Sequence, residues 1–167
     1  MGGAVHLTVL AHLWQMNEKE GNMSIELLLV EDSAGDVRLM REVLLGVNDS
    51  IHLLVVSDGA EAMAFLNREG NYARSPRPDL ILLDLNLPQM DGREVLACIK
   101  ANDKLKTIPV IVLTISDFEA DIVESYQLQA SCYLCKPAQL SEFETLMRTI
   151  NRFWMTEVKL PEQTHIH

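Results

Sequence analysis

Acidic, hydroxyl and lysine side chains directly follow four short apolar runs of the sequence. These side chains are the pair Glu31-Asp32, then Asp84, Thr114 and Lys136. Each run has the length and the β-branched or leucine-rich composition of a buried strand. In a parallel sheet the carboxyl ends of the strands meet at one edge, where ligands bind. We therefore expect these five side chains to share one pocket.

Such a pocket favours phosphoryl chemistry. Like charges about 4 Å apart repel by several kcal/mol at an effective dielectric near 20, so three carboxylates need a cation. Mg²⁺ is the usual cation beside a phosphoryl group, and Asp84 is the candidate nucleophile, since a carboxylate can form an acyl phosphate. Lys136 can neutralise phosphoryl oxygens in the loose transition state, and the Thr114 hydroxyl can hydrogen-bond them. Each residue alone has an ordinary structural explanation; the order of all of them at four strand ends indicates the site.

Five β–α units are expected to position these groups. Because helical patterns separate the apolar runs, the sequence predicts a doubly wound α/β fold with a parallel sheet. The predicted strands are Glu26–Glu31, Ile51–Val56, Asp79–Asp84, Pro109–Thr114 and Ser131–Cys135.

The predicted helices follow from turn pairs and apolar periodicity. The first helix is expected to start near Asp36, a plausible N-cap. Asp58-Gly59 and Asp91-Gly92 are turn pairs before the next two helices, and Gly70–Pro78 is a loop. The fourth helix carries Phe118, Ile122 and Tyr126 at i, i+4 and i+8, and the last has Leu140, Phe143, Met147, Ile150 and Trp154 along one stripe.

Composition narrows the possible partners and location. The chain has 167 residues, 48% of them hydrophobic, and a net charge of −10. This length suits one domain, and the charge argues against nucleic acid or an anionic membrane surface as a partner, but not against a protein. Three cysteines suit a reducing cytoplasm. Cys132 and Cys135 could suggest a redox pair or half a zinc site, but residues three apart in a strand point to opposite faces.

The first 23 residues differ from the rest. Ala4–Trp14 is mostly apolar but too short for a membrane span and wrongly flanked for a signal peptide. We interpret residues 1–23 as an extension outside the core; the alternative is an amphipathic segment that docks on the domain or a partner. The domain itself is expected to cover residues 24–156, followed by a tail over 157–167.

Several motifs together resemble the CheY-like receiver domain of two-component response regulators. The matching stretches are Leu28–Asp32, Asp58–Ala62, Leu82–Pro88, Met90–Gly92, Ile108–Thr114 and Tyr133–Pro137. The resemblance implies a flavodoxin-like sheet of five parallel strands in the order 2-1-3-4-5 with five helices. It also implies that Asp84 accepts a phosphoryl group from a sensor histidine kinase in a phosphorelay.

The resemblance also implies roles for individual residues. Asp32 and Asp84 would bind Mg²⁺ directly, Glu31 through water, and the backbone carbonyl of Asn86 would complete the shell. Thr114 and Tyr133 match the switch pair, in which the hydroxyl moves toward the phosphoryl group and the ring turns inward. Asn86 and Ser116 stand where the family tunes phosphoryl lifetime, and Lys136-Pro137 matches a bond that is usually cis. Cys135, directly before Lys136, departs from the usual pattern.

A closer resemblance is to single-domain regulators paired with phytochrome kinases. It is carried by Val30–Ser33 with Gly35–Leu39, the long loop Gly70–Pro78, the helix around Ile122–Tyr126, and the closing Phe153-Trp154. It implies a phytochrome-type kinase as donor. It further implies a homodimer through the face made by the fourth helix, fifth strand and fifth helix. Phe153 and Trp154 suit such an interface, although they could equally cap the core.

We expect the protein to be a signalling switch rather than an enzyme. It should dephosphorylate itself slowly, and another protein should recognise its changed surface. One alternative is a pseudo-receiver that serves as a scaffold without phosphorylation. A second is a phosphohydrolase of the haloacid dehalogenase type, which needs an acid two residues after its nucleophile. That position is Asn86, which cannot act as a general acid.

Overall fold

Five parallel strands form one sheet in the computed structural model, which describes residues 24–47 and 50–161. The strands are β1 (Ile25–Val30), β2 (Ile51–Val56), β3 (Leu80–Leu83), β4 (Val110–Thr114) and β5 (Cys132–Cys135). Their order is β2-β1-β3-β4-β5 and each neighbouring pair is parallel. The predicted fold class and strand order are therefore confirmed.

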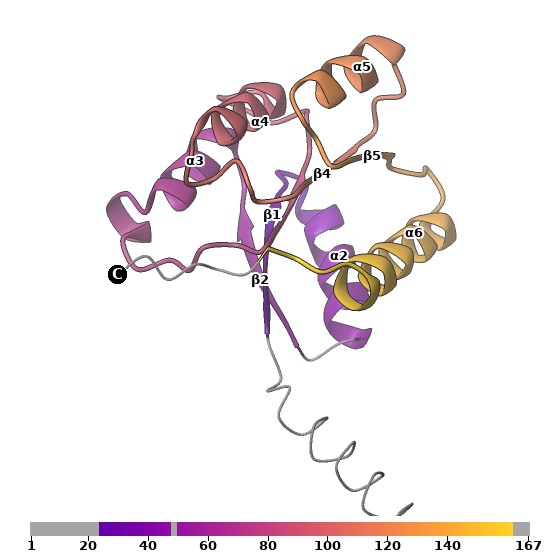
Figure 1. Cartoon of the computed structure of the whole chain (residues 1–167). Coiled ribbons are helices and arrows are strands. Elements are labelled where there is room, and N and C mark those ends of the chain that lie inside the picture. Colours follow the sequence, from indigo (N-terminus) through magenta and orange to yellow (C-terminus); the bar gives the residue numbers. More distant parts are fainter. Residues whose placement is uncertain (1–23, 48–49, 162–167) are drawn as a thin grey trace, which may run out of the picture.

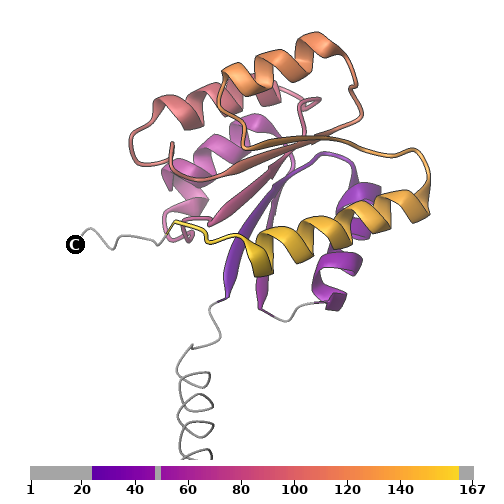
Figure 2. The ribbon, with the colours of Figure 1, turned by 45° about the vertical axis from the view of Figure 1, so that its right-hand side comes forward.

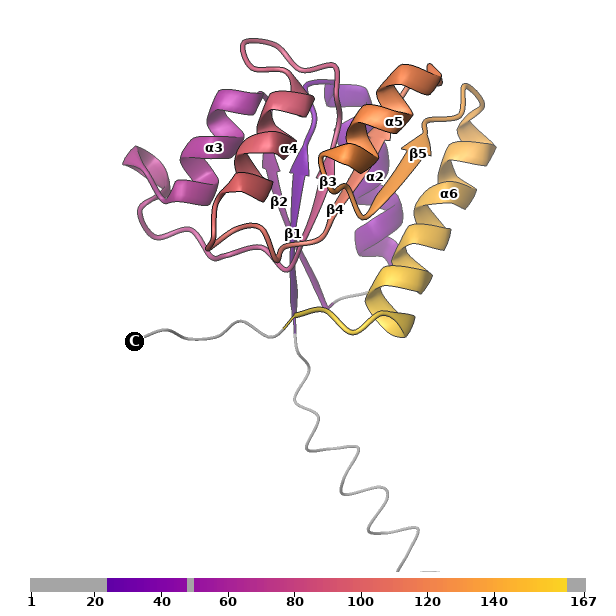
Figure 3. The same cartoon turned by 45° about the horizontal axis from the view of Figure 1, so that its top comes forward.

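Helices cover both faces of this sheet. They are α2 (Ala34–Val47), α3 (Gly59–Asn67), α4 (Gly92–Ala101), α5 (Glu119–Gln127) and α6 (Leu140–Arg152). Helices α3, α4 and α5 lie on one face and α2 and α6 on the other (Figures 1 and 3). In the turned view of Figure 2 the strands run between these two helical layers. A 3₁₀ turn (Gly70–Tyr72) interrupts the predicted loop, and a π-helical turn (Phe153–Glu157) extends α6.

The central strand β3 shows why the sheet forms from nearly continuous apolar runs. All four of its residues are buried, and they alternate between the two cores. Leu80 and Leu82 pack with α2 and α6, whereas Ile81 and Leu83 pack with α3 and α4. A strand covered on both faces needs apolar residues at every position, which is the pattern that predicted it.

The start of the first described helix differs from the prediction. Helix α2 begins at Ala34, and Ser33 is its cap: the Ser33 Oγ accepts from the Asp36 N–H at 3.3 Å, and its carbonyl accepts from the Val37 N–H. Asp36 therefore lies in the first turn rather than at the N-cap. Ser33 and Asp36 stand three residues apart, the spacing of a capping box, and this spacing was the better indicator of the helix start.

The two later apolar stripes are only partly buried. In α6, Phe143, Met147 and Ile150 are buried as expected, but Leu140, at the first turn, is 59% exposed. Trp154 packs against the same core from the π-helical turn. Phe118 and Tyr126 of the α5 stripe are exposed.

The Lys136-Pro137 bond also differs from expectation. No peptide bond of the described residues is cis, so this bond is trans, the ordinary preference of an X-Pro bond.

The expectations for residues 1–23, and for the tail beyond residue 161, lie outside the described residues. Within the described part of the chain, no helix is both long and apolar enough to cross a bilayer.

Candidate functional site

Three carboxylates converge at the carboxyl edge of the sheet. Glu31 and Asp32 follow β1, and Asp84 follows β3, its neighbour in the sheet. Because Val30 pairs with Leu83, the residues after each strand are brought side by side. One oxygen from each carboxylate lies within 4.8 Å of the others. Glu31 and Asp84 are buried, whereas Asp32 is exposed.

Lys136 reaches this cluster from the end of β5. Its Nζ donates to Glu31 Oε2 at 2.6 Å, Asp84 Oδ2 at 2.7 Å and Asp36 Oδ2 at 3.0 Å, and only 5% of its side chain is exposed. Burial lowers the pKa of Lys136, but hydrogen bonds and charge attraction from Asp84 and Glu31 outweigh burial, so its pKa lies above the usual range. The ammonium therefore stays charged beside Asp84.

Glu31 is held by the protein on both carboxylate oxygens. Oε1 accepts from the Ser33 N–H at 3.0 Å and Oε2 accepts from Lys136. Burial raises the pKa of Glu31, and the hydrogen bonds and charge of Lys136 offset this rise only in part. The protein therefore engages both oxygens of this buried carboxylate.

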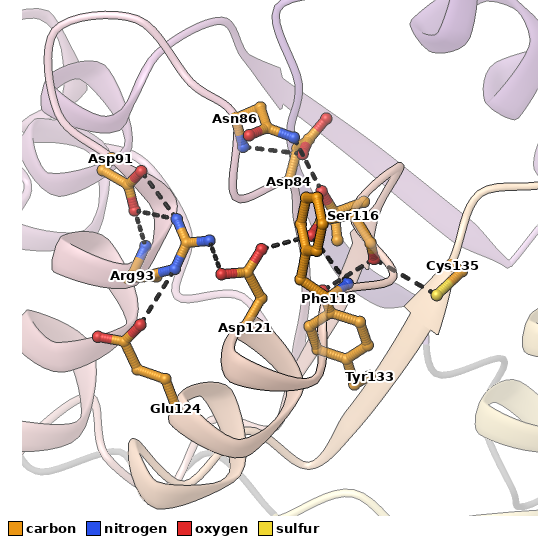
Figure 4. Close-up of polar contacts among 11 residues, drawn as sticks. Asp84, Asn86, Asp91, Arg93, Ser116, Phe118, Asp121, Glu124, Tyr133 and Cys135 are labelled. Atoms are coloured by element: carbon orange, nitrogen blue, oxygen red, sulfur yellow. Dashed lines mark hydrogen bonds and ion pairs between the residues drawn. The ribbon is translucent and has the colours of Figure 1, made fainter.

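Thr114 and Asn86 form a second polar group beside Asp84. Thr114 ends β4 and is fully buried, and its Oγ1 accepts from Asn86 Nδ2 at 3.1 Å. The Asn86 N–H donates to Asp84 Oδ1 at 3.0 Å. Asn86 thus links the candidate nucleophile to the predicted switch hydroxyl. Figure 4 shows its contact with Asp84.

Tyr133 and Cys135 both donate to one carbonyl in the loop after β4. The Tyr133 hydroxyl lies 3.0 Å from the Ser116 carbonyl oxygen, and Cys135 Sγ lies 3.4 Å from it. Ser116 Oγ in turn donates to Asp121 Oδ2 at the start of α5 (Figure 4). The predicted switch tyrosine is therefore tied to the backbone of the predicted tuning residue.

Gly92 allows the start of α4 to pack closely against the loop that contains Asp84. The Gly92 N–H donates to the Leu85 carbonyl at 2.9 Å, and a Cβ at Gly92 would lie 2.2 Å from the Asp84 carbonyl oxygen. The preceding Asp91 caps α4 with a complete capping box together with Glu94. Through Gly92, the Met90-Asp91-Gly92 motif thus packs directly against the backbone of Asp84 and Leu85.

The donor set fits a hard divalent cation. Counting Asp36, four carboxylates face one ammonium, so the cluster carries excess negative charge. Its ligand atoms are oxygens, which Mg²⁺ prefers. Glu31, Asp32 and Asp84 are the carboxylates that could hold the ion, because one oxygen from each lies within 4.8 Å of the others.

Asp36 is the site residue that sequence reasoning missed. It was interpreted as a helix cap, yet its carboxylate is one of the three partners of Lys136. In the first turn of α2 it points back toward the strand ends, and the Ser33–Asp36 spacing was the available signal.

Comparisons with known proteins identify the family of this chain. The profile of the response regulator receiver domain matches residues 27–148. Response regulator Rcp1 of Synechocystis sp. is 51% identical over 142 residues, which are 85% of this chain and 97% of Rcp1.

Two solved structures are similar in fold and sequence. The Mn²⁺-bound form of Rcp1 superposes with a TM-score of 0.80 at 50% identity, over 83% of this chain and 99% of that one. The phosphorylated cyanobacterial phytochrome response regulator RcpA has a TM-score of 0.80 at 48% identity, with the same coverage. The chain therefore belongs to the family of response regulator receiver domains.

Proposed function

We propose that this protein is a phosphorelay switch that accepts a phosphoryl group on Asp84 from a histidine kinase. The observation that carries the proposal is the contact of 2.7 Å between Lys136 Nζ and Asp84 Oδ2, inside a buried acidic cluster. A buried ammonium that donates to the candidate nucleophile and to neighbouring carboxylates is the arrangement that phosphoryl transfer to a carboxylate needs.

The transfer is a substitution at phosphorus. An Asp84 carboxylate oxygen attacks the phosphorus of a phosphohistidine, the P–N bond breaks, and its electron pair stays on the imidazole. Lys136 moves its hydrogen bonds from Asp84 to the phosphoryl oxygens. Asp32, Asp84 and the Asn86 carbonyl, assisted by Glu31, would hold Mg²⁺, which would neutralise charge on these oxygens.

The signal then passes through the hydroxyl of Thr114. That hydroxyl accepts from Asn86 Nδ2, and the same oxygen can donate its own proton to the new phosphoryl group. Tyr133 turns inward as its bond to Ser116 is exchanged, and Asn86 and Ser116 set the rate at which the phosphoryl group is lost. Acyl phosphate formation is thus a switching event, with slow self-hydrolysis as its reset.

Similarity to relatives supports the identity of the donor kinase, and exposed aromatic side chains support a homodimer. RcpA is described as a phytochrome response regulator, and its 48% identity supports a phytochrome-type kinase as donor. We place a homodimer on the face of α5, β5 and α6, where Phe118, Tyr126 and Phe153 are exposed. The receiver domain over residues 24–156, flanked by an N-terminal extension and a short tail, acts in the cytoplasm without contact to nucleic acid or membrane.

Intact mass after incubation with acetyl phosphate and Mg²⁺ tests the proposal. We expect one added phosphoryl group on the wild type, none on Asp84→Asn, and full addition on the control Asp103→Asn, which alters an exposed carboxylate of a surface ion pair. Size exclusion on the same samples reports dimerisation. A folded wild type that takes up neither a phosphoryl group nor beryllofluoride would instead support the scaffold. Turnover of a generic phosphate ester would support a hydrolase.

A further inference from the structure

Asp36 is a fourth carboxylate beside Asp84, and it is partly open to solvent. Its side chain is 36% exposed, whereas the side chains of Glu31 and Asp84 are 1% and 7% exposed. Its Oδ2 accepts from Lys136 Nζ at 3.0 Å, and the same nitrogen donates to Asp84 Oδ2 at 2.7 Å. One shared ammonium therefore joins Asp36 to the candidate nucleophile.

The contacts of Lys136 use its whole hydrogen-bonding capacity. A lysine ammonium has three N–H donors and no acceptor. Its three acceptors here are Glu31, Asp36 and Asp84. Because Glu31 and Asp36 take two of the donors, they direct the third toward Asp84. They also neutralise part of the positive charge that Lys136 can offer to a phosphoryl group.

The local backbone before α2 determines where Asp36 lies. The Ser33 N–H donates to Glu31 Oε1 at 3.0 Å, and Ser33 Oγ accepts from the Asp36 N–H at 3.3 Å. The Val37 N–H donates to the Ser33 carbonyl at 2.9 Å, which places Asp36 in the first helical turn. All of these contacts lie within residues 31–37. The location of Asp36 beside the site is thus a property of this turn and does not rest on the loops after β3 and β4.

A negative charge at Asp36 acts in opposite directions on the two ions of the proposed reaction. It attracts a divalent cation and repels the negatively charged phosphoryl group. Asp36 is not among the three carboxylates whose oxygens lie within 4.8 Å of one another, which are those of Glu31, Asp32 and Asp84. We therefore assign Asp36 an effect through its charge and through Lys136, and not the role of a metal ligand.

We propose that Asp36 is a positioning residue whose charge strengthens the binding of Mg²⁺ at this site and weakens the binding of a phosphoryl group at Asp84. Part of this effect acts across the site, and part acts through Lys136, whose charge Asp36 neutralises. This inference rests on the proposed phosphorylation of Asp84.

Two titrations of the full chain by calorimetry test the assignment, one with Mg²⁺ alone and one with beryllofluoride, a phosphoryl mimic, at saturating Mg²⁺. Asp36→Asn removes the charge but keeps an oxygen that can accept from Lys136. We expect this variant to bind Mg²⁺ about three- to tenfold more weakly than the wild type, and beryllofluoride about three- to tenfold more tightly. A loss of packing around the site would instead weaken the binding of both ions.

Charge and salt provide two further readouts. Asp36→Glu restores the charge and should return both affinities toward those of the wild type. An increase in ionic strength from about 0.05 M to about 0.5 M should shrink the differences between wild type and Asp36→Asn, because salt screens partly exposed charges.

Glu42→Gln is the matched control on the same helix. It removes one negative charge from the exposed Arg38–Glu42 pair, at 3.7 Å, and should leave both affinities unchanged. Urea unfolding of each variant confirms a folded protein. Asp36→Ala also removes the charge and provides a second route if Asp36→Asn does not fold.

The outcomes separate this inference from the proposed function. Opposite shifts of the two affinities in Asp36→Asn, reduced by salt and missing from Glu42→Gln, support the assignment. If the wild type binds beryllofluoride and the Asp36→Asn affinities shift in the same direction, for one ion only, or not at all, the assignment is overturned and the proposed phosphorylation stands. A folded wild type that binds no beryllofluoride overturns both.

Discussion

Helices α4 and α5 lie side by side on one face of the sheet (Figures 1 and 3) but are attached to the molecule in different ways. Helix α4 buries Gly92, Val95, Leu96 and Ile99 and begins with a full capping box. Helix α5 buries only Ser125, lacks a side-chain cap, and exposes Val123 and Tyr126. Apolar burial holds the first helix, and ion pairs from Arg93 to two α5 carboxylates hold much of the second.

This difference indicates which helix can respond to chemistry at Asp84. Burial of a large apolar side chain contributes about 1.5–3 kcal/mol, whereas partly exposed ion pairs contribute about 1 kcal/mol or less. Elements that move in switches are drawn from the less stable parts of a fold. Helix α4 therefore supports the loop of Asp84, and α5 is the element that we expect the proposed phosphorylation to move.

The largest contrast is expected from core truncation in the two helices. Leu96→Ala in α4 should lower the free energy of unfolding by about 2–5 kcal/mol, because it leaves a cavity in the core. Val123→Ala in α5 should change it by less than about 1 kcal/mol, since Val123 is 44% exposed. Urea denaturation followed by circular dichroism measures both. Equal losses would mean that α5 is packed as firmly as α4.

A methyl group added at Gly92, the first residue of α4, should have the second-largest effect on the free energy of unfolding. Gly92→Ala places a Cβ 2.2 Å from the Asp84 carbonyl oxygen, and relieving this overlap should cost about 1–3 kcal/mol and slow phosphorylation by acetyl phosphate. Gly46→Ala in α2 is the matched control, because a Cβ there meets nothing within 4 Å. It should be neutral or stabilising by up to about 1 kcal/mol. The same cost at both positions would contradict a tight support under Asp84.

Substitutions at the N-caps of α4 and α5 should change the free energy of unfolding by smaller amounts and in opposite directions. Asp91→Ala removes the capping box of α4 and should cost about 1 kcal/mol in unfolding free energy. Phe118→Ser supplies α5 with the side-chain cap it lacks and should gain about 0.5–1 kcal/mol. Thermal unfolding of both variants decides the matter, and a destabilised Phe118→Ser would show that the exposed ring packs better than its position suggests.

The smallest predicted effect is that of acid, which should weaken the attachment of α5. The Ser116 hydrogen bond and Arg93 lower the pKa of Asp121 below its ordinary 3.8. A carboxyl with a lowered folded pKa stabilises the fold above its unfolded pKa, and this stabilisation is lost as pH falls through the folded value. The stability difference between wild type and Asp121→Asn should therefore be constant at neutral pH, begin to shrink below about pH 3.8, and be lost only as the pH falls through the lower folded pKa. A difference that persists there would mean that Asp121 acts through packing.

Much of the candidate site could be predicted because its signals are local. The strands that precede Glu31, Asp84 and Thr114 are buried on both faces, so their apolar runs mark where each strand ends. A parallel sheet then brings those ends together without further information. The convergence of the carboxylates with Lys136 followed from this pattern, whereas the strand order was implied by the resemblance to receiver domains.

Contacts between segments distant in sequence were decided only in the folded protein. Asp36 was interpreted as a cap, but the folded chain places its carboxylate against Lys136, 100 residues later. Arg93 carries no local signal at all, because its partners on α5 lie 28 and 31 residues away.

The sequence by itself determined the elements and the chemistry at their ends, since hydrophobic period and strand length are properties of neighbouring residues. Only the tertiary structure decided that Phe118 and Tyr126 face solvent and that charged contacts hold α5. The physical reason is that helical spacing predicts an apolar face on a helix, but it does not predict whether another element will cover that face. That depends on how far each helix lies from the sheet.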